Sequence, residues 1–247
     1  GSAARGGRVV LRAARTGAGA GDGVALGELG ERDGKIVGAE QVEVEAYKVY
    51  DGDGSGITGL VAGSSSGNQL GLISVQEDND DFVAAVDAVA LKGNLDTGAA
   101  GFHLRPGVEV RNPVETGVAN SGDIALTGDW NLNPLRHNGE AGVLTVRAGG
   151  QLDVAANLSD GFSTATASGA LQTRPVGWSY RLVAGADLGA ADPLATQSGV
   201  AADIKVEAGK LVRTGTGDIQ AAASGDFVLA DAAALYSAGV ASATLAD

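Results

Sequence analysis

The chain has 247 residues, a formal net charge of −13, and neither cysteine nor methionine. The missing cysteine excludes disulfides and cysteine-based zinc sites, and the acidic balance disfavours nucleic acids and anionic membrane surfaces as partners. No apolar run is long enough to span a membrane, so we expect no membrane insertion. Because no methionine opens the chain, we expect Gly1-Ser2 to be a cloning scar and residues 3–247 to be one segment of a larger protein.

Apolar and polar residues alternate in two stretches of the N-terminal third, which predicts strands with one buried face. The first strand is expected at residues 6–14, and the second at residues 41–50, ending or bulging near Lys48. The residues expected to face inward are Val9, Leu11, Val42, Val44 and Ala46. The polar, Gly/Ser-rich stretch 51–67 that follows is expected to be an insertion.

Residues 78–93 break the alternation and form a second expected insertion. Apolar residues at helical spacing, Phe82, Ala85, Val86 and Val89, predict one amphipathic helix near residues 81–92. Four acids, Glu77, Asp78, Asp80 and Asp81, come just before its first turn. Carboxylates there cap free N–H groups and meet the positive end of the helix dipole. We expect this helix to cover apolar surface.

Strand patterns return after residue 101. They are expected at 102–104, 108–110, 124–126, 130–132, 143–146, 152–154 and 178–183, and then densely over 204–236. Pro106-Gly107 is expected to form a turn between the first two. Ile124 and Leu126 are expected to stack on Leu144 and Val146, a step of about 20 residues. Imperfect repeats of short strands punctuated by glycine predict an all-β solenoid, a parallel β-helix.

Candidate catalytic and metal-binding groups are sparse. The two histidines, His103 and His137, accompany no cysteine and no GxSxG motif, so we expect them to be structural or exposed. The spacing of Asp51, Asp53 and Ser55 matches the start of an EF-hand loop. The twelfth position is Ala62 rather than glutamate, which favours an acidic turn and leaves calcium binding open.

Two further groups have a functional and a structural interpretation. The acid run before the expected helix could be a general-acid pair or a metal cluster, but its sequential spacing favours helix capping. Five scattered aromatic residues could form a sugar-stacking platform, although packing is the simpler role: Tyr47, Tyr50, Trp130, Trp178 and Tyr180. We therefore expect no catalytic, cofactor-binding or metal-binding residues, no cofactor and no enzymatic activity.

Several phrases resemble the filamentous-haemagglutinin-type large exoproteins of Gram-negative bacteria. The longest is GDIALTGDWNLNPLRHNGEAGVLTVRAGGQLDVAANLSDGF at residues 122–162, and shorter ones lie at 6–13, 102–110 and 214–230. The resemblance implies a right-handed parallel β-helix, two-partner secretion through an outer-membrane transporter, and a role in adhesion, biofilm formation or contact-dependent competition. The family's Asn-Pro-Asn secretion motif is not evident, because Asn133-Pro134-Leu135 lacks the pattern.

We therefore expect a structural or adhesive segment of a secreted or cell-surface exoprotein. Its loops at 51–67 and 163–177, with the helix at 81–92, would contact a receptor or glycan on a host or bacterial cell. The alternative is a β-helical carbohydrate-active enzyme, a polysaccharide lyase or hydrolase, which needs acids from neighbouring strands beside a basic residue. A toxin effector domain fits the repetitive pattern less well.

Overall fold

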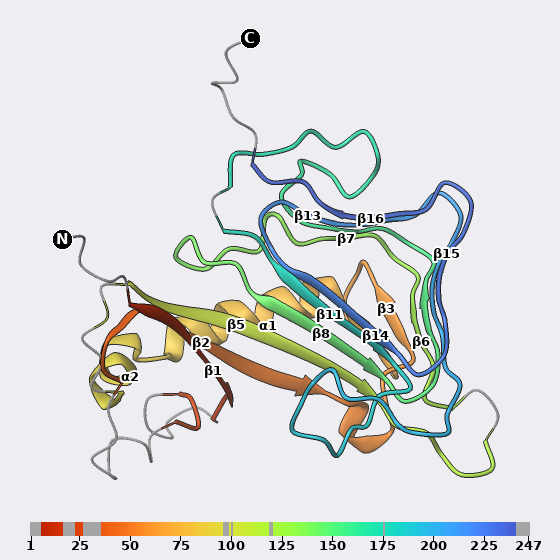
Figure 1. Ribbon diagram of the computed structural model, residues 1–247, viewed down its shortest axis with the longest axis horizontal. Coiled ribbons are helices and arrows are strands. Elements are labelled where there is room, and N and C mark those ends of the chain that lie inside the picture. Colours follow the sequence, from red (N-terminus) through yellow and green to blue (C-terminus); the bar gives the residue numbers. More distant parts are fainter. Residues whose placement is uncertain are drawn as a thin grey trace.

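A computed structural model describes residues 6–16, 23–26, 36–95, 99, 101–118, 121–174 and 176–240. Its strands form three sheets in which every pair of neighbouring strands is parallel. The first sheet has the order β1 (Gly7–Ala14), β2 (Ala39–Tyr50), β5 (Gly101–Asn112), β8 (Val143–Ala148), β11 (Ser179–Ala184), β14 (Ile219–Ala223). The shorter strands of the other two sheets face its inner side (Figure 1).

The second sheet has the order β15 (Phe227–Leu229), β12 (Ile204–Val206), β9 (Leu152–Val154), β6 (Ile124–Leu126), β3 (Gly59–Val61), β4 (Gln69–Gly71). The third has the order β16 (Ala234–Ser237), β13 (Leu211–Thr214), β10 (Leu158–Ser159), β7 (Trp130–Asn131). An apolar core lies between the three sheets, with members such as Leu144, Leu152 and Leu158 from each in turn. The stretch 51–67, expected as an insertion, contains β3.

The structure contradicts the expected all-β parallel β-helix with one inserted helix near residues 81–92. The parallel sheets include one that curls into a half-barrel, and the arrangement is of α/β type rather than a solenoid. The described residues form two α-helices, α1 (Leu72–Ala85) and α2 (Ala88–Asn94). The prediction failed because alternation marks a strand with one buried face in any sheet and carries no information on how the sheet curls.

The expected capping role of the acid run is also wrong. Helix α1 begins at Leu72, so Glu77 to Asp81 lie within it, beyond the first turn. The acid that caps a helix is Asp87, whose side chain accepts hydrogen bonds from the N–H groups of Val89 and Ala90 at the start of α2. Helix α2 does cover apolar surface, because its Leu91 packs in a second apolar cluster with residues of β2.

The strand partners differ from those expected. Ile124 pairs with Leu152, whereas Leu144 lies between Val108 and Tyr180 in the first sheet. Connections of unequal length separate the strands, so a constant step of about 20 residues does not describe the register. Alternation located these strands, but it did not identify their neighbours.

Two local predictions in the first sheet are wrong as well. Strand β2 continues through Lys48 to Tyr50, and β5 runs unbroken through Pro106-Gly107. Gly107 is required there by close approach rather than by a turn: a Cβ atom at this position would lie 2.8 Å from the Cα of Tyr47. A glycine inside a strand often marks such an approach between backbones.

Candidate functional site

The outer face of the first sheet carries charged side chains, several of which are buried, among them Glu45, Glu109 and Arg147. Period-2 alternation places Val42 and Val44 on the inner face and Glu43 and Glu45 on the outer one. The side chains of the outer face form what we call the arginine–glutamate network: Arg8, Arg12, Glu43, Glu45, Arg105, Glu109, Arg111, Arg147 and Arg181. Burial of so many charges requires each of them to have a partner.

Glu109 on β5 is the centre of this network and is 0% exposed. Its carboxylate accepts hydrogen bonds from Arg12, from Arg111 Nε at 2.6 Å and from Arg147 Nη1 at 3.1 Å. Burial alone would raise the pKa of Glu109, but the charges and hydrogen bonds of Arg12 and Arg111 outweigh it and lower the pKa below its usual value. The carboxylate is therefore ionised at neutral pH.

Glu45 on β2 joins strands that are not neighbours. It accepts hydrogen bonds from Arg12 Nε on β1 at 2.9 Å and from Arg181 Nη1 on β11 at 2.8 Å. Because β5 and β8 separate β2 from β11, this contact exists only where the sheet curls towards itself. The Arg12 guanidinium also lies over the Tyr47 ring, 3.8 Å from its centroid, a favourable cation–π geometry.

Arg105 links the network to the loops beyond β7 and β10. It donates hydrogen bonds to the carbonyls of Ala141, Gly142 and Gly177 at 2.8–2.9 Å. Burial lowers the pKa of Arg105, and the charge of Glu43, 3.5 Å away, opposes that shift. Arg105 remains protonated at neutral pH because an arginine pKa starts far above it.

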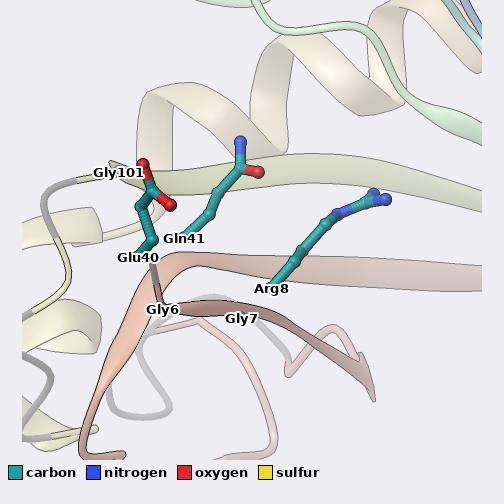
Figure 2. A pocket seen from close by; sticks show the side chains of 6 residues that line it. All are labelled: Gly6, Gly7, Arg8, Glu40, Gln41 and Gly101. Carbon is teal, nitrogen blue, oxygen red and sulfur yellow. The ribbon is translucent and has the colours of Figure 1, made fainter. Parts of the chain in front are cut away.

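A hollow of about 360 Å³ opens at the N-terminal end of this network. Gly7 pairs with Ala39 whereas Arg8 pairs with Gln41, so Glu40 is the extra residue of a β-bulge between β1 and β2. A bulge changes the direction in which side chains point, and Figure 2 shows the side chains of Arg8, Glu40 and Gln41 pointing to the same side.

Three glycines complete the hollow, and they explain its shape. The hollow is lined by Gly6, Gly7, Arg8, Glu40, Gln41 and Gly101. A Cβ on Gly6 would lie 2.3 Å from the Gly38 carbonyl oxygen, so a larger residue would push β1 away from the bulge. The result is a shallow, open site with guanidinium, carboxylate and amide groups that can hydrogen-bond a polar ligand.

His103 lies near this hollow and forms a dyad with an acid. Its Nδ1 lies 2.6 Å from Glu140 Oε1, and a Cβ on Gly101 would lie 3.4 Å from its Nε2. A carboxylate that orients a histidine is one half of a nucleophile–base arrangement. None of the residues that line the hollow is Ser, Thr or Cys, so the described residues do not complete that arrangement here.

The acid run meets a second polar cluster where α1 packs against the first sheet. Asp78 accepts hydrogen bonds from Lys48 Nζ at 2.6 Å and from the Tyr50 hydroxyl at 2.9 Å. Asp80 lies 3.2 Å from His137 Nδ1. The acids therefore fasten the helix to strands and a loop, while Glu77 and Asp81 of the same run are exposed.

Burial sets the protonation of this second cluster. It lowers the pKa of Arg15, whose guanidinium donates a hydrogen bond to Asn79 Oδ1 on α1, to about 10. Burial and the nearby charge of Asp78 both raise the pKa of Tyr50. Burial also lowers the pKa of His137, against the opposing effect of Asp80. His137 is neutral at pH 7 and largely buried, in keeping with a structural role. A neutral phenol and a neutral imidazole at this packing surface avoid unpaired charge.

The aromatic residues do not gather into a platform. Trp130, Trp178 and Tyr180 are buried, and each donates a hydrogen bond to a backbone carbonyl: those of Val61, Leu135 and Arg213. Tyr47 and Tyr50 lie on opposite faces of β2, one in the arginine–glutamate network and the other against α1. The packing interpretation is therefore correct.

The EF-hand-like stretch folds as a tight turn. Gly52–Gly54 form a short 3-10 helix, closed by the bond from the Gly54 N–H to the Asp51 carbonyl. Across the described residues there is no group of three or more His, Cys, Asp or Glu side chains placed to hold a metal ion. None of the described helices has the length and apolarity required to cross a bilayer.

The spacing of charged residues along the first strands is a sequence signal for the charged face. Along β1 and β5 the charged residues share one parity, and on β2 Glu43 and Glu45 share one parity beside Arg8 and Arg12 of β1, whereas Glu40 and Lys48 have the other. Such spacing predicts that arginines and glutamates meet across parallel strands.

Comparisons of this chain with protein-family models, with curated proteins and with solved structures gave no match.

Proposed function

We propose that the chain is a non-catalytic structural and adhesive segment of a secreted bacterial surface protein, and that the hollow beside Arg8 binds a glycan. The observation that carries the proposal is that the hollow presents polar groups to solvent, whereas the carboxylates behind it are buried. Arg8, Glu40 and Gln41 offer planar hydrogen-bonding groups to solvent. Sugar hydroxyls, which both donate and accept, match such groups.

The buried carboxylates favour a structural role over catalysis. A glycosidase needs a carboxylic acid whose raised pKa keeps it protonated near neutral pH. In the arginine–glutamate network, arginines lower the pKa of Glu43 and Glu109 despite the opposing effect of burial. These groups hold the sheet together as carboxylates and are poorly suited to donate a proton.

The loop expected to bind a receptor is held in a fixed shape, which also fits a binding role. Arg213 lies over the Phe162 ring, 3.7 Å from its centroid. It donates hydrogen bonds to the carbonyls of Thr164 and Thr166 at 3.0 and 2.6 Å. A loop that is ordered before binding loses less conformational entropy on contact with its target.

The proposed place of the parent protein follows from the resemblance to haemagglutinin-type exoproteins. We propose export through an outer-membrane two-partner-secretion transporter and display outside the cell. The acidic composition supports a role away from nucleic acids. The open hollow on the first sheet would then face cell-surface glycans.

Binding of the labelled chain to immobilised bacterial and host-cell glycans tests the proposal. The double variant Arg8→Ala/Gln41→Ala should lose about tenfold or more in affinity, because both side chains line the hollow. The matched control Glu115→Gln changes an exposed acid outside the hollow and should bind as the unmodified chain does. Equal binding by the double variant would contradict the glycan site.

The rival function is carbohydrate cleavage by the His103–Glu140 pair beside the hollow. Incubation with uronic-acid and neutral polysaccharides, followed by reducing-end and unsaturated-product assays, separates the two functions. Turnover that disappears in His103→Gln would overturn the non-catalytic proposal. Glycan binding without turnover, weakened by Arg8→Ala/Gln41→Ala, supports it.

A further inference from the structure

His103 lies next to the glycine that shapes the hollow on β5. Arg8, Gln41 and Gly101 are register partners across β1, β2 and β5. His103 comes two residues after Gly101, on the same face of β5, and pairs with Glu43. A Cβ on Gly101 would lie 3.4 Å from both His103 Nε2 and Gln41 Cγ. Because Gly101 has no side chain and lines the hollow, the Nε2 atom of His103 is reached from there.

The other ring nitrogen of His103 determines what Nε2 offers to a ligand. Nδ1 lies 2.6 Å from Glu140 Oε1. A carboxylate only accepts hydrogen bonds, so Nδ1 carries the proton, and in the neutral ring Nε2 keeps a lone pair. Nε2 makes no hydrogen bond within the described residues, and the His103 side chain is 28% exposed. His103 therefore presents a hydrogen-bond acceptor at the wall of the hollow.

A tight turn holds Glu140 in place. His137 and Glu140 exchange backbone hydrogen bonds at 3.1 and 2.9 Å around Asn138-Gly139. Asn138 and Gly139 have φ values of 52° and 82°, as in a type I′ hairpin turn, for which Asn-Gly is a preferred sequence. The carboxylate that orients the His103 ring is therefore positioned by the backbone, and the tautomer is set before a ligand binds.

The charges around the hollow oppose an acidic ligand. Three carboxylates lie in or beside it, those of Glu40, Glu43 and Glu140, against the guanidinium groups of Arg8 and Arg105. Both arginines pair with Glu43, at 2.6 and 3.5 Å, whereas Glu40 is exposed and forms no ion pair within the described residues. A carboxylated sugar would meet this negative charge, whereas the hydroxyls of an uncharged sugar can donate to the free acceptors.

We infer that His103 determines the specificity of the hollow, and that the ligand is an uncharged, hydroxyl-rich sugar with one hydroxyl donating a hydrogen bond to Nε2. This inference rests on the proposed glycan site and narrows it to neutral sugars. Arg8 and Gln41 bond the sugar oxygens on the β1 and β2 side. Glu140 acts through His103 as a positioning residue. A site built to bond a hydroxyl discriminates strongly against a ligand that lacks it, because the polar group of the site then has no partner.

Nitrogen NMR tests the tautomer without any ligand. In the ¹⁵N-labelled chain at mildly alkaline pH, His103 should show a protonated Nδ1 and an unprotonated Nε2. The chain has two histidines, so the signals that disappear in His103→Phe are those of His103. Glu140→Gln, whose amide can also donate to Nδ1, should shift the ring towards the Nε2–H tautomer. An Nε2–H tautomer in the unmodified chain would overturn the inference.

Binding to matched polysaccharides tests the ligand class. The probes are immobilised mannan and galactan, with polymannuronate and polygalacturonate as counterparts in which a carboxylate replaces the hydroxymethyl group. We expect a neutral polymer to bind about tenfold or more tighter than its acidic counterpart. His103→Phe keeps a ring but no acceptor, and should weaken binding of that neutral polymer about tenfold. The corresponding neutral disaccharide should shift the Nε2 signal of the unmodified chain.

A glycine variant tests access to Nε2 without a change in the ring. Gly101→Ala places a methyl group in ordinary van der Waals contact with His103 Nε2 and Gln41, so the chain should fold with the same tautomer. The methyl group covers Nε2, and neutral-polymer binding should fall about tenfold. The control Gly93→Ala lies in α2, where a Cβ would meet nothing within 4 Å, and should bind as the unmodified chain does. Circular dichroism establishes that each variant is folded.

The outcomes separate a failure of this inference from a failure of the glycan site. Binding that is lost in Arg8→Ala/Gln41→Ala but unchanged in His103→Phe overturns the inference and leaves the glycan site. Equal affinity for the neutral and acidic polymers does the same. No binding of any polymer overturns both. Neutral-polymer binding that is weakened by His103→Phe and by Gly101→Ala, with a ligand-dependent shift at Nε2, supports the inference.

Discussion

Both faces of the first sheet contain buried side chains, yet the two faces are stabilised in different ways. On the inner face Val42 and Val44 are fully buried among other apolar side chains. On the outer face Glu45 and Arg147 are each 2% exposed and lie in a network of ion pairs. Apolar packing tolerates exchange of one side chain for another of similar volume, whereas a buried charge tolerates no loss of its partner.

This difference explains why the stability of the charged face depends on the curl of the sheet. In a flat sheet the outer side chains would be solvated, and their ion pairs would contribute little. Curling brings Arg181 to Glu45 across two intervening strands and excludes water from Glu109. The contact between Glu45 and Arg181 therefore depends on the curvature of the sheet.

The largest expected effect comes from removal of the central carboxylate. Glu109→Ala leaves Arg12, Arg111 and Arg147 without a shared partner, and we expect a loss of about 4 kcal/mol in the free energy of unfolding, measured by urea denaturation. The exposed acid Glu115, changed to alanine, should cost less than about 0.5 kcal/mol. Similar losses in both variants would show that the network contributes no more than surface charge.

An inner-face cavity should have the next largest effect. Leu144 is buried between the three sheets, so Leu144→Ala should cost about 3 kcal/mol. Leu144→Met, which conserves volume, should cost less than about 1.5 kcal/mol, whereas Glu109→Gln, also close in volume, should stay near the alanine value. Tolerance of Glu109→Gln would remove the proposed distinction between the faces.

Acid should weaken the outer face selectively. The pKa values of Glu43 and Glu109 are lowered on folding, despite burial, by their arginine partners. Their stabilisation is therefore present above the ordinary value of 4.5 and is lost as pH falls from there through the lower folded values. Each unit of lowering corresponds to about 1.4 kcal/mol.

The comparison to make is the pH dependence of unfolding in the unmodified chain and in Glu109→Gln. The variant should show a shallower loss of stability below pH 4.5, since one titrating carboxylate is absent. Leu144→Ala should lower the whole curve without a change in its slope. Parallel curves for the unmodified chain and Glu109→Gln would contradict a lowered pKa at this residue.

The sequence predicted the strands of both faces but not the sheet that joins them. Alternation located β1 and β2 and correctly placed Val42, Val44 and Ala46 inside, because period 2 follows from strand geometry itself. The same alternation placed Glu43 and Glu45 on the opposite face, where solvent is the usual expectation. Their burial depends on curvature, which arises from contacts between distant strands such as Glu45 and Arg181.

The helix and the hollow show the same limit. Spacing of Phe82 and Val86 indicated a helix, but the start at Leu72 and the separate α2 depend on how the chain packs on β4 and β2. The hollow depends on a one-residue shift between Gly7 and Arg8 in the pairing of β1 with β2. A bulge of this kind leaves no pattern in either strand alone.

The smallest expected effect is at the solvent-exposed end of the network. Arg8 is bonded to Glu43 at 2.6 Å, as short as the contact between Arg111 and Glu109, but its side chain is 47% exposed. Solvent screens such a pair, and Glu43 keeps Arg105 at 3.5 Å when Arg8 is removed, so Arg8→Ala should cost less than about 1 kcal/mol. Arg105→Ala is the matched comparison, because it is buried and also leaves three backbone carbonyls without its donors, and it should cost clearly more. If urea denaturation gave equal losses for the two arginines, burial would not decide how much a charged side chain of the outer face contributes to stability, and the contrast with the inner face would lose its physical basis.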